Sequence, residues 1–254
     1  QTATEYWQRR GSLVHTDTQG NDLEQPDSVR IYIWGSSEHY ADPMLRIPNK
    51  GPCQNFSNVV RTSMLFRAAL DNLDRWATDG TPPPDSRHPK RADGTLLSGA
   101  EWRAQFPAIP GVMLPHGPAT LELYDFGSDF ENGLLNKEPP ELADAKGYPT
   151  MVLATDEDGN DLGCVRAPMV TAPLATYTGW NLRDRGQGFG AKHKFTGSTL
   201  PLPETPEERQ VTGDPRRSIL ERYGNKAGYV AAIRTAAEKL VDEGLMLEED
   251  VERC

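Results

Sequence analysis

Residues 29–39 constrain the fold of this chain more than any other segment. Six largely apolar, β-branched and aromatic residues, from Val29 to Trp34, lead into a Gly/Ser turn that ends at His39. A short apolar run without strict alternation is typical of a strand buried on both faces, as in a parallel sheet covered by helices. The segment therefore predicts an α/β architecture in which a histidine follows the carboxyl end of a buried strand.

His39 is the chain's main candidate for a general base. A catalytic imidazole must be reachable by substrate yet held in one orientation, and a loop just past a buried parallel strand meets both needs. None of the 254 residues forms the Gly-x-Ser-x-Gly elbow that usually supplies the matching nucleophile. Ser36, Ser37 and Cys53 are the nearest alternatives, but the two serines precede the histidine in one turn and lack an elbow. The sequence thus predicts a base without its serine.

A carboxylate that orients the imidazole would strengthen this interpretation. Glu38 is adjacent to His39, but neighbouring side chains in an extended turn usually point apart. Glu5, in the segment TATEYW (residues 2–7), is the better candidate. A structural histidine without a catalytic role is the alternative reading of His39.

Charge and hydropathy exclude two classes of partner. With 27 basic against 37 acidic side chains, the net charge is −10, which repels phosphate backbones, so nucleic acid is not expected as a partner. No apolar run reaches the roughly 20 residues that cross a bilayer, so we expect a soluble protein without a membrane span. Because the chain starts at Gln1 with no leader, we expect a processed product or a fragment. The compartment stays open, with the periplasm and secretion among the alternatives.

No metal or other cofactor is expected. Cys53, Cys164 and Cys254 show no Cys-x-x-Cys spacing, and sequence leaves open whether Cys53 and Cys164 form a disulfide. The acidic segment DEDGND (residues 156–161) has its glycine at the fourth place, where a calcium-binding EF-hand loop needs it at the sixth. Asp-Gly between two apolar runs is instead a hairpin signal. We predict a β-hairpin of residues 151–154 and 162–165.

Three segments have helical character. Residues 4–10 predict a short helix with Thr4 as its cap. Residues 57–77 predict a long helix that ends at Gly80 and packs on a sheet through a stripe of Phe66, Ala69, Leu70, Leu73, Trp76 and Ala77. A third helix begins at Asn225 or Lys226 and closes at Gly244.

The segment from Pro82 to Pro149 is rich in proline and contains eleven of the 21 prolines, both ends included. Recurrent aromatic and aliphatic anchors there predict an ordered extension that wraps a surface rather than a second core domain. The expected organisation is an α/β core in residues 1–80, the Pro-rich extension in 81–150, a hairpin and loop region in 151–200, and helices in 201–254.

Several motifs over nearly the whole chain resemble the C-terminal part of large bacterial α/β-hydrolase-domain proteins. They are TEYW (residues 4–7), SLVHTD (12–17), VRIY (29–32) with Gly35 and His39, PLATYTGWNLR (173–183), GDPR (213–216) and ERYG (221–224). The resemblance implies the C-terminal part of an α/β-hydrolase sheet.

In that superfamily the catalytic triad runs nucleophile, acid, histidine along the chain. The resemblance therefore implies Glu5 as the acid and His39 as the histidine of a Ser-His-Glu triad that cleaves small carboxylic esters. It places the serine and oxyanion hole before Gln1, on an N-terminal hydrolase portion, so that the isolated chain is inactive. Trp180, within PLATYTGWNLR, is expected to pack in the core or to contact substrate.

A non-catalytic role is the alternative. Many chains keep a hydrolase-like scaffold and serve as binding or assembly modules, since a fold does not fix a function. Glu5 and His39 would then be ordinary polar groups satisfied locally. Labelling by an active-site probe separates the two hypotheses.

Overall fold

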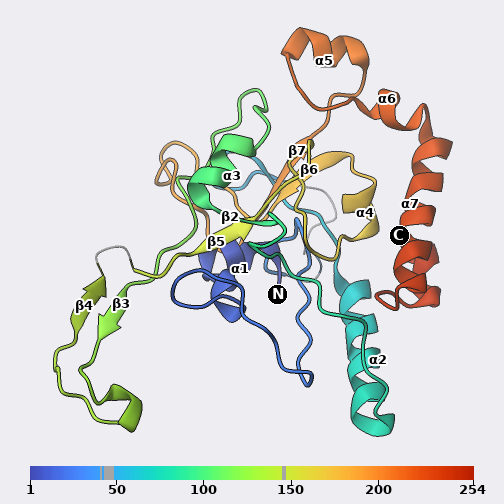
Figure 1. Ribbon diagram of the computed structural model, residues 1–254. Coiled ribbons are helices and arrows are strands. Elements are labelled where there is room, and N and C mark those ends of the chain that lie inside the picture. Colours follow the sequence, from blue (N-terminus) through green and yellow to red (C-terminus); the bar gives the residue numbers. More distant parts are fainter. Residues whose placement is uncertain (41, 43–48, 145–146) are drawn as a thin grey trace.

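A computed structural model describes residues 1–40, 42, 49–144 and 147–254 (Figure 1). Its α-helices are α1 (Ala3–Gln8), α2 (Ser63–Asp79), α3 (Gly99–Gln105), α4 (Pro168–Thr171), α5 (Pro206–Thr212), α6 (Ile219–Tyr223) and α7 (Lys226–Asp242). The strands are β1 (Phe56–Ser57), β2 (Leu96–Ser98), β3 (Leu123–Asp125), β4 (Glu141–Asp144), β5 (Met151–Leu153), β6 (Ala175–Thr178) and β7 (Ser198–Pro201). Short 3-10 helices span Gly11–Val14, Phe130–Asn132 and Glu248–Arg253.

The strands form small antiparallel sheets. β7 lies between β1 and β6, with Ser198 opposite both Ser57 and Thr178. β2 pairs with β5, and β3 pairs with β4. Helices and these sheets together are consistent with the α/β class that the sequence predicted.

The predicted strand of residues 29–34 is extended and largely buried, but it is not a continuous strand. Tyr32 forms a single parallel bridge with Arg87, and Trp34 forms parallel bridges with Thr2 and Val165. Each neighbouring segment pairs with this run through single residues, so no ladder develops. The bridges nevertheless have the parallel direction that the apolar pattern indicated.

The N-terminal helix is capped two residues earlier than predicted. The backbone N–H of Thr2 donates to Oε2 of Glu5 over 2.8 Å, and the Thr2 hydroxyl donates to the same oxygen. This is the capping-box spacing, Thr-x-x-Glu, so α1 begins at Ala3 and Thr4 lies inside it. The Thr4 side chain is buried and donates to the carbonyl of Gly179.

The long helix α2 ends where the sequence predicted but starts later. Residues 56–57 pair with β7 as strand β1, so α2 begins at Ser63 rather than at 57. It ends at Asp79, because Gly80 has a φ of 78°, a left-handed conformation that glycine adopts without strain.

The predicted packing stripe of α2 is not its buried face. Leu70 is 68% exposed, and Phe66 and Leu73 are also exposed. The buried residues of α2 are Met64, Leu65, Ala68 and Asn72. An apolar stripe indicates which face of a helix avoids water, but among the described residues this face is covered only in part, by contacts such as that of Phe66 with Trp34.

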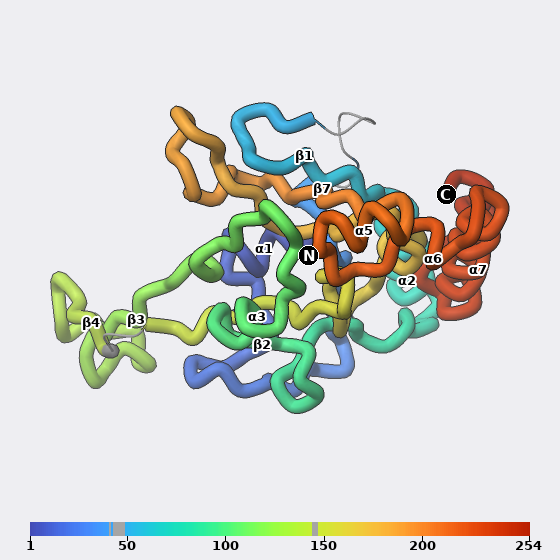
Figure 2. The backbone as a smooth tube through the Cα atoms, turned by 90° about the horizontal axis from the view of Figure 1, so that it is seen from above, coloured from blue at the N-terminus to red at the C-terminus, as the bar shows by residue number. Residues whose placement is uncertain are grey.

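The Pro-rich extension divides into two parts. Trp102, Phe106 and Ile109 enter the main hydrophobic core, as anchors of a wrapping segment should. The β3–β4 hairpin instead projects away from the core at the end of the molecule opposite α7 (Figures 1 and 2). Tyr124, one of the aromatic residues of the extension, is exposed on that hairpin.

The acidic turn forms, but the predicted hairpin is incomplete. Thr155 and Asp161 make an antiparallel bridge around Gly159, whose φ is 82°. β5 takes β2 as its strand partner, however, and Val165 pairs with Trp34. Residues 162–165 leave the turn toward the segment that carries His39.

Two buried clusters hold these elements together. One gathers aromatic side chains of α1, α3 and the following loops, namely Tyr6, Trp7, Trp102, Phe106 and Trp180. The other joins Trp34, Leu65 of α2, Val165, Tyr177 of β6 and Leu240 of α7. The C-terminal helix α7, predicted from its periodicity, therefore packs through Ala236, Ala237 and Leu240. None of the helices in the described ranges is long and apolar enough to cross a membrane.

Candidate active site

The structure brings Glu5 and His39 together. Oε1 of Glu5 lies 2.6 Å from Nδ1 of His39. The Glu5 side chain is 17% exposed and that of His39 is 37% exposed, so the imidazole can be reached from solvent while its carboxylate partner is largely enclosed. A carboxylate at Nδ1 fixes one tautomer of a neutral imidazole, the one whose Nε2 can accept a proton.

Glu5 is held from both sides. Its Oε2 accepts the two hydrogen bonds from Thr2 that cap α1, which leaves Oε1 for His39. The N-terminal cap of α1 therefore orients the Glu5 carboxylate. Thr2 was missed as a site residue, although the Thr-x-x-Glu spacing is a recognisable signal.

The turn that delivers His39 is fixed by buried hydrogen bonds. The N–H of Ser36 donates to Oδ2 of Asp161 over 2.6 Å, and the N–H of Asp161 donates to the Ser36 hydroxyl over 2.8 Å. Nδ2 of Asn58 donates to the carbonyls of Ser36 and Thr178. Gly35 is required here, since a Cβ at this position would lie 2.2 Å from Sγ of Cys164. This reciprocal clamp prevents the turn from moving independently of the core.

Glu38 points away from the imidazole, toward the backbone N–H of Gly197, which donates to its Oε2. Burial raises the pKa of Glu38 to about 7, against the opposing effects of that hydrogen bond and of His39. A carboxyl group with such a pKa is largely or partly protonated at neutral pH. Glu5, not Glu38, contacts the ring.

Phe195 covers one face of the His39 ring. The ring centroids lie 4.3 Å apart at an interplanar angle of 20°, and the carbonyl of Phe195 accepts from the N–H of His39. Phe195 has a φ of 64°, a left-handed conformation that is unusual for a bulky residue. Arg9 and Lys194 approach the Phe195 ring as cations. No sequence motif marked Phe195, because its contact with His39 spans most of the chain.

The in-chain nucleophile candidates do not reach His39. Ser36 and Ser37 are fully buried, and the Ser37 hydroxyl donates to the carbonyl of Trp34. Cys53 is buried, and burial raises the pKa of its thiol, which disfavours the reactive thiolate. In the part of the chain that the structure describes, Nε2 of His39 has no hydrogen-bond partner.

Trp180 lies in the core. It is 1% exposed and packs at an angle against Trp7, Trp102 and Phe106. This position favours the packing role over direct contact with substrate.

The cysteines form no disulfide, and acidic residues of the turn at 156–161 form ion pairs with arginines. Cys53, Cys164 and Cys254 carry free thiols, so no Cys53–Cys164 disulfide is present. In the acidic turn, Asp156 pairs with Arg166 over 2.8 Å and Asp158 pairs with Arg222. Among the described residues, no three His, Cys, Asp or Glu side chains gather as a metal site.

A pair of histidines is buried beside Tyr6 of α1. His15 and His88 lie with ring centroids 4.5 Å apart, and Nε2 of His15 lies 2.6 Å from the Tyr6 hydroxyl. His88 is buried as well, and its ring packs against that of His15. Burial, aided by the nearby His88, lowers the pKa of His15 to about 4.

Acid is expected to destabilise the protein through His15. A folded-state pKa of about 4, below the ordinary 6.5, means that the unfolded chain binds the proton more strongly. The contribution of His15 to the free energy of unfolding is therefore fully present above about pH 6.5. Roughly 3 kcal/mol of it is lost as the pH drops toward 4. Urea unfolding of wild type and His15→Gln across this range measures the effect. The variant should lose less stability with acid, whereas exposed His116→Gln should follow wild type; an unchanged slope in His15→Gln contradicts the assignment.

Comparison with known families places this site in context. The family model described as an alpha/beta hydrolase domain matches residues 6–254. The chain therefore belongs to the α/β-hydrolase domain family, whose members are associated with hydrolase activity. Comparisons with curated proteins and with solved structures found no significant match.

Proposed function

We propose that this chain is the C-terminal portion of a serine hydrolase that cleaves carboxylic esters, with His39 as general base and Glu5 as the acid of the triad. The contact between Oε1 of Glu5 and Nδ1 of His39, at 2.6 Å, carries the proposal. Nε2 is left without a partner among the described residues, as a base needs before its nucleophile is in place. Membership of the hydrolase family supports this assignment.

The proposed reaction is acyl transfer in two steps. Nε2 of His39 accepts the proton of a serine hydroxyl while the serine oxygen attacks the ester carbonyl. Glu5 accepts the hydrogen bond from Nδ1 and stabilises the imidazolium. His39 then returns the proton to the departing alcohol, leaving an acyl-enzyme. Water, deprotonated by the same imidazole, hydrolyses the acyl-enzyme to the acid and restores the serine.

The serine comes from a segment outside these 254 residues. The sequence contains no Gly-x-Ser-x-Gly elbow, and the serines nearest to His39 are buried in structural hydrogen bonds. The exposed apolar face of α2, with Phe66, Leu70 and Leu73, supports a further packed segment, since apolar surface gains about 25 cal/mol per Å² on burial. We propose an N-terminal hydrolase portion as this segment.

A fluorophosphonate probe tests the proposal directly, because it reacts with activated serines. The complete hydrolase should be labelled, and mass spectrometry of its peptides should place the label outside residues 1–254. The isolated chain should remain unlabelled. Labelling within residues 1–254 would overturn the assignment, and no labelling of the complete protein would favour the binding-module alternative.

The substrate class needs its own measurement. The complete hydrolase should release p-nitrophenol from a short p-nitrophenyl ester, and prior fluorophosphonate labelling should abolish that release. A labelled enzyme that leaves short carboxylic esters intact would retain the serine hydrolase class but contradict the ester assignment.

A further inference from the structure

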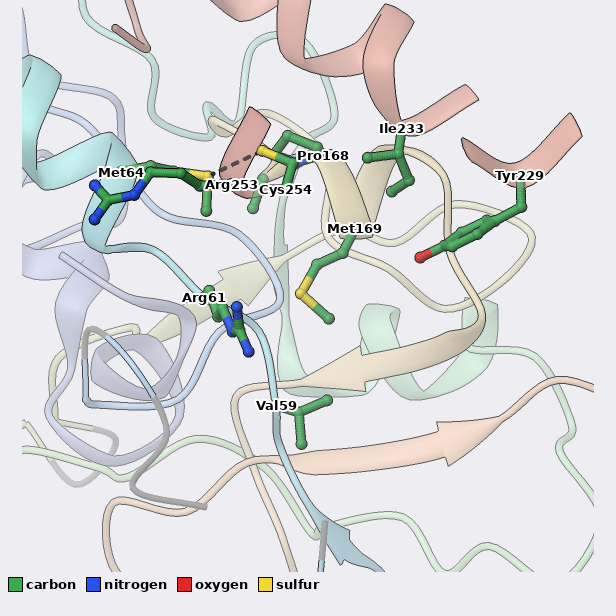
Figure 3. A pocket seen from close by; sticks show the side chains of 10 residues that line it. Val59, Arg61, Met64, Pro168, Met169, Tyr229, Ile233, Arg253 and Cys254 are labelled. Carbon is green, nitrogen blue, oxygen red and sulfur yellow. Dashed lines mark hydrogen bonds between the residues drawn. The ribbon is translucent and has the colours of Figure 1, made fainter. Parts of the chain in front are cut away.

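A cavity lies away from Glu5 and His39, between residues 59–61 and helices α2, α4 and α7 (Figure 3). Its volume is about 220 Å³. Figure 3 shows Met169 of α4 and the Tyr229 and Ile233 side chains of α7 around this space, with Val59 and Arg61 on the facing segment. Neither Glu5 nor His39 lines it, so the cavity is separate from the proposed triad.

The walls of this cavity are mainly apolar. The apolar residues of its lining include Val59, Met64, Ala167, Pro168, Met169 and Ile233. Methionine side chains are flexible and polarisable, so they adapt to ligands of varied shape. No aspartate or glutamate side chain lines the cavity, although the whole chain carries a net charge of −10.

Arg61 is the cation of this cavity that lacks a partner. The side chain of Arg61 is half-buried, and it has no hydrogen bond or ion pair with any residue in the described ranges. The other lining arginine, Arg253, is already paired with Asp250 over 2.9 Å. A partly desolvated guanidinium beside an apolar wall is unfavourable unless an anion pairs with it.

Tyr229 adds a hydroxyl donor. Its hydroxyl points from α7 toward Met169 (Figure 3), and it has no hydrogen-bond partner among the residues described. Burial raises the pKa of Tyr229, so the hydroxyl keeps its proton at neutral pH. Two polar donors therefore line a cavity whose other walls are mainly apolar, the usual composition of a small-molecule site.

We propose that this cavity binds a small amphipathic carboxylate. Its carboxylate pairs with Arg61, its hydrocarbon part lies against Met64, Met169 and Ile233, and the Tyr229 hydroxyl is the second polar donor in the lining. The volume equals that of about seven waters at roughly 30 Å³ each, which suits a ligand of roughly seven to ten non-hydrogen atoms. Hexanoate is a suitable probe. The site does not use the triad, so its failure leaves the proposed function untouched.

Isothermal titration of the complete protein with hexanoate tests this site. Hexanoate should bind, hexanol should bind at least tenfold more weakly, and Arg61→Gln should weaken hexanoate binding at least tenfold, as loss of a charge-assisted hydrogen bond requires. Arg61→Lys should restore binding to within a few-fold of wild type. Arg234→Gln is the matched control, because Arg234 lies on α7 outside the cavity and pairs with Glu252.

Other outcomes would overturn the site. Equal binding of hexanol and hexanoate, or unchanged binding by a folded Arg61→Gln variant, would remove the role of Arg61. Binding lost in His39→Ala but retained in Arg61→Gln would place the acid at the triad instead.

The source of the acid is separable in the same protein. Arg61-dependent inhibition of ester hydrolysis by hexanoate would identify the acid product of the proposed reaction as the ligand. Arg61-dependent binding without inhibition would identify a carboxylate from another source. Both results require Arg61 and thus support the site.

Discussion

Replacing His39 by alanine in the complete hydrolase is expected to lower kcat/KM for ester hydrolysis by about a thousandfold or more. The variant removes the group that accepts the serine proton, from a side chain that is 37% exposed and stacks on Phe195. The loss should appear mainly in kcat, since the general base acts in the transition state rather than in substrate binding. Steady-state kinetics together with circular dichroism would measure activity and folding.

The control for this variant is His116→Ala, which changes an exposed histidine outside the site. It should retain wild-type turnover. Glu5→Gln should show an intermediate loss, because the amide can still contact Thr2 but no longer stabilises an imidazolium. Near-normal turnover by folded His39→Ala would contradict the triad and favour the binding-module hypothesis.

Replacing Arg216 by alanine is expected to cost about 3–5 kcal/mol of stability. Arg216 is fully enclosed and forms two hydrogen bonds to the carboxylate of Asp214, with Nε 3.0 Å from Oδ1 and Nη2 2.6 Å from Oδ2. Nη1 also donates to the Thr176 hydroxyl and the Leu200 carbonyl, which joins the motif GDPR to β6 and β7. Burial opposes ionisation of Asp214, but the hydrogen bonds from Arg216 lower its pKa overall. The variant leaves that carboxylate buried without its cation.

Denaturant unfolding should separate this effect from a general sensitivity of the segment. Arg217→Ala changes the next, exposed residue and should stay within about 0.5 kcal/mol of wild type. A double variant, Asp214→Leu with Arg216→Met, should regain part of the loss because it leaves no unpaired charge. A loss below about 1 kcal/mol in Arg216→Ala would contradict a structural role for the pair.

Local signals predicted α1, α2 and α7, although α2 begins later than predicted and α3 was not predicted. The C-terminal helix α7 follows from its apolar periodicity and from Asn225, whose side chain accepts from the N–H of Gly228. The end of α2 follows from Gly80, because helices often end at a residue in the left-handed conformation, and glycine adopts this conformation without strain. These features depend on residues close together in the chain, which is why sequence alone carries them.

Features that depend on distant partners were not predictable in the same way. Residues 29–34 have the composition of a buried strand, but whether they form a ladder depends on Arg87 and Val165. In the second arm of the predicted hairpin, Val165 likewise pairs with Trp34, which is distant in the sequence. The apolar stripe of α2 gave the wrong buried face, since periodicity reports apolarity and not which neighbour is present.

The residues of the candidate site also differ in whether the sequence predicted them. The sequence indicated His39 from its position after an apolar run and Glu5 as its carboxylate partner, and the family resemblance implied the same pair. Phe195, which stacks on the imidazole, and Gly197, which binds Glu38, carry no motif that links them to His39. Thr2 could have been recognised from its spacing to Glu5.

The double use of the Glu5 carboxylate explains why this position needs glutamate rather than aspartate. At the third position of α1, the side chain must return to the N–H of Thr2 with one oxygen and present the other to Nδ1 of His39. An aspartate is one methylene shorter and could not span both. The length of the acid in this proposed triad is thus dictated by the first turn of a helix, and chain folding and proton transfer share a single carboxylate.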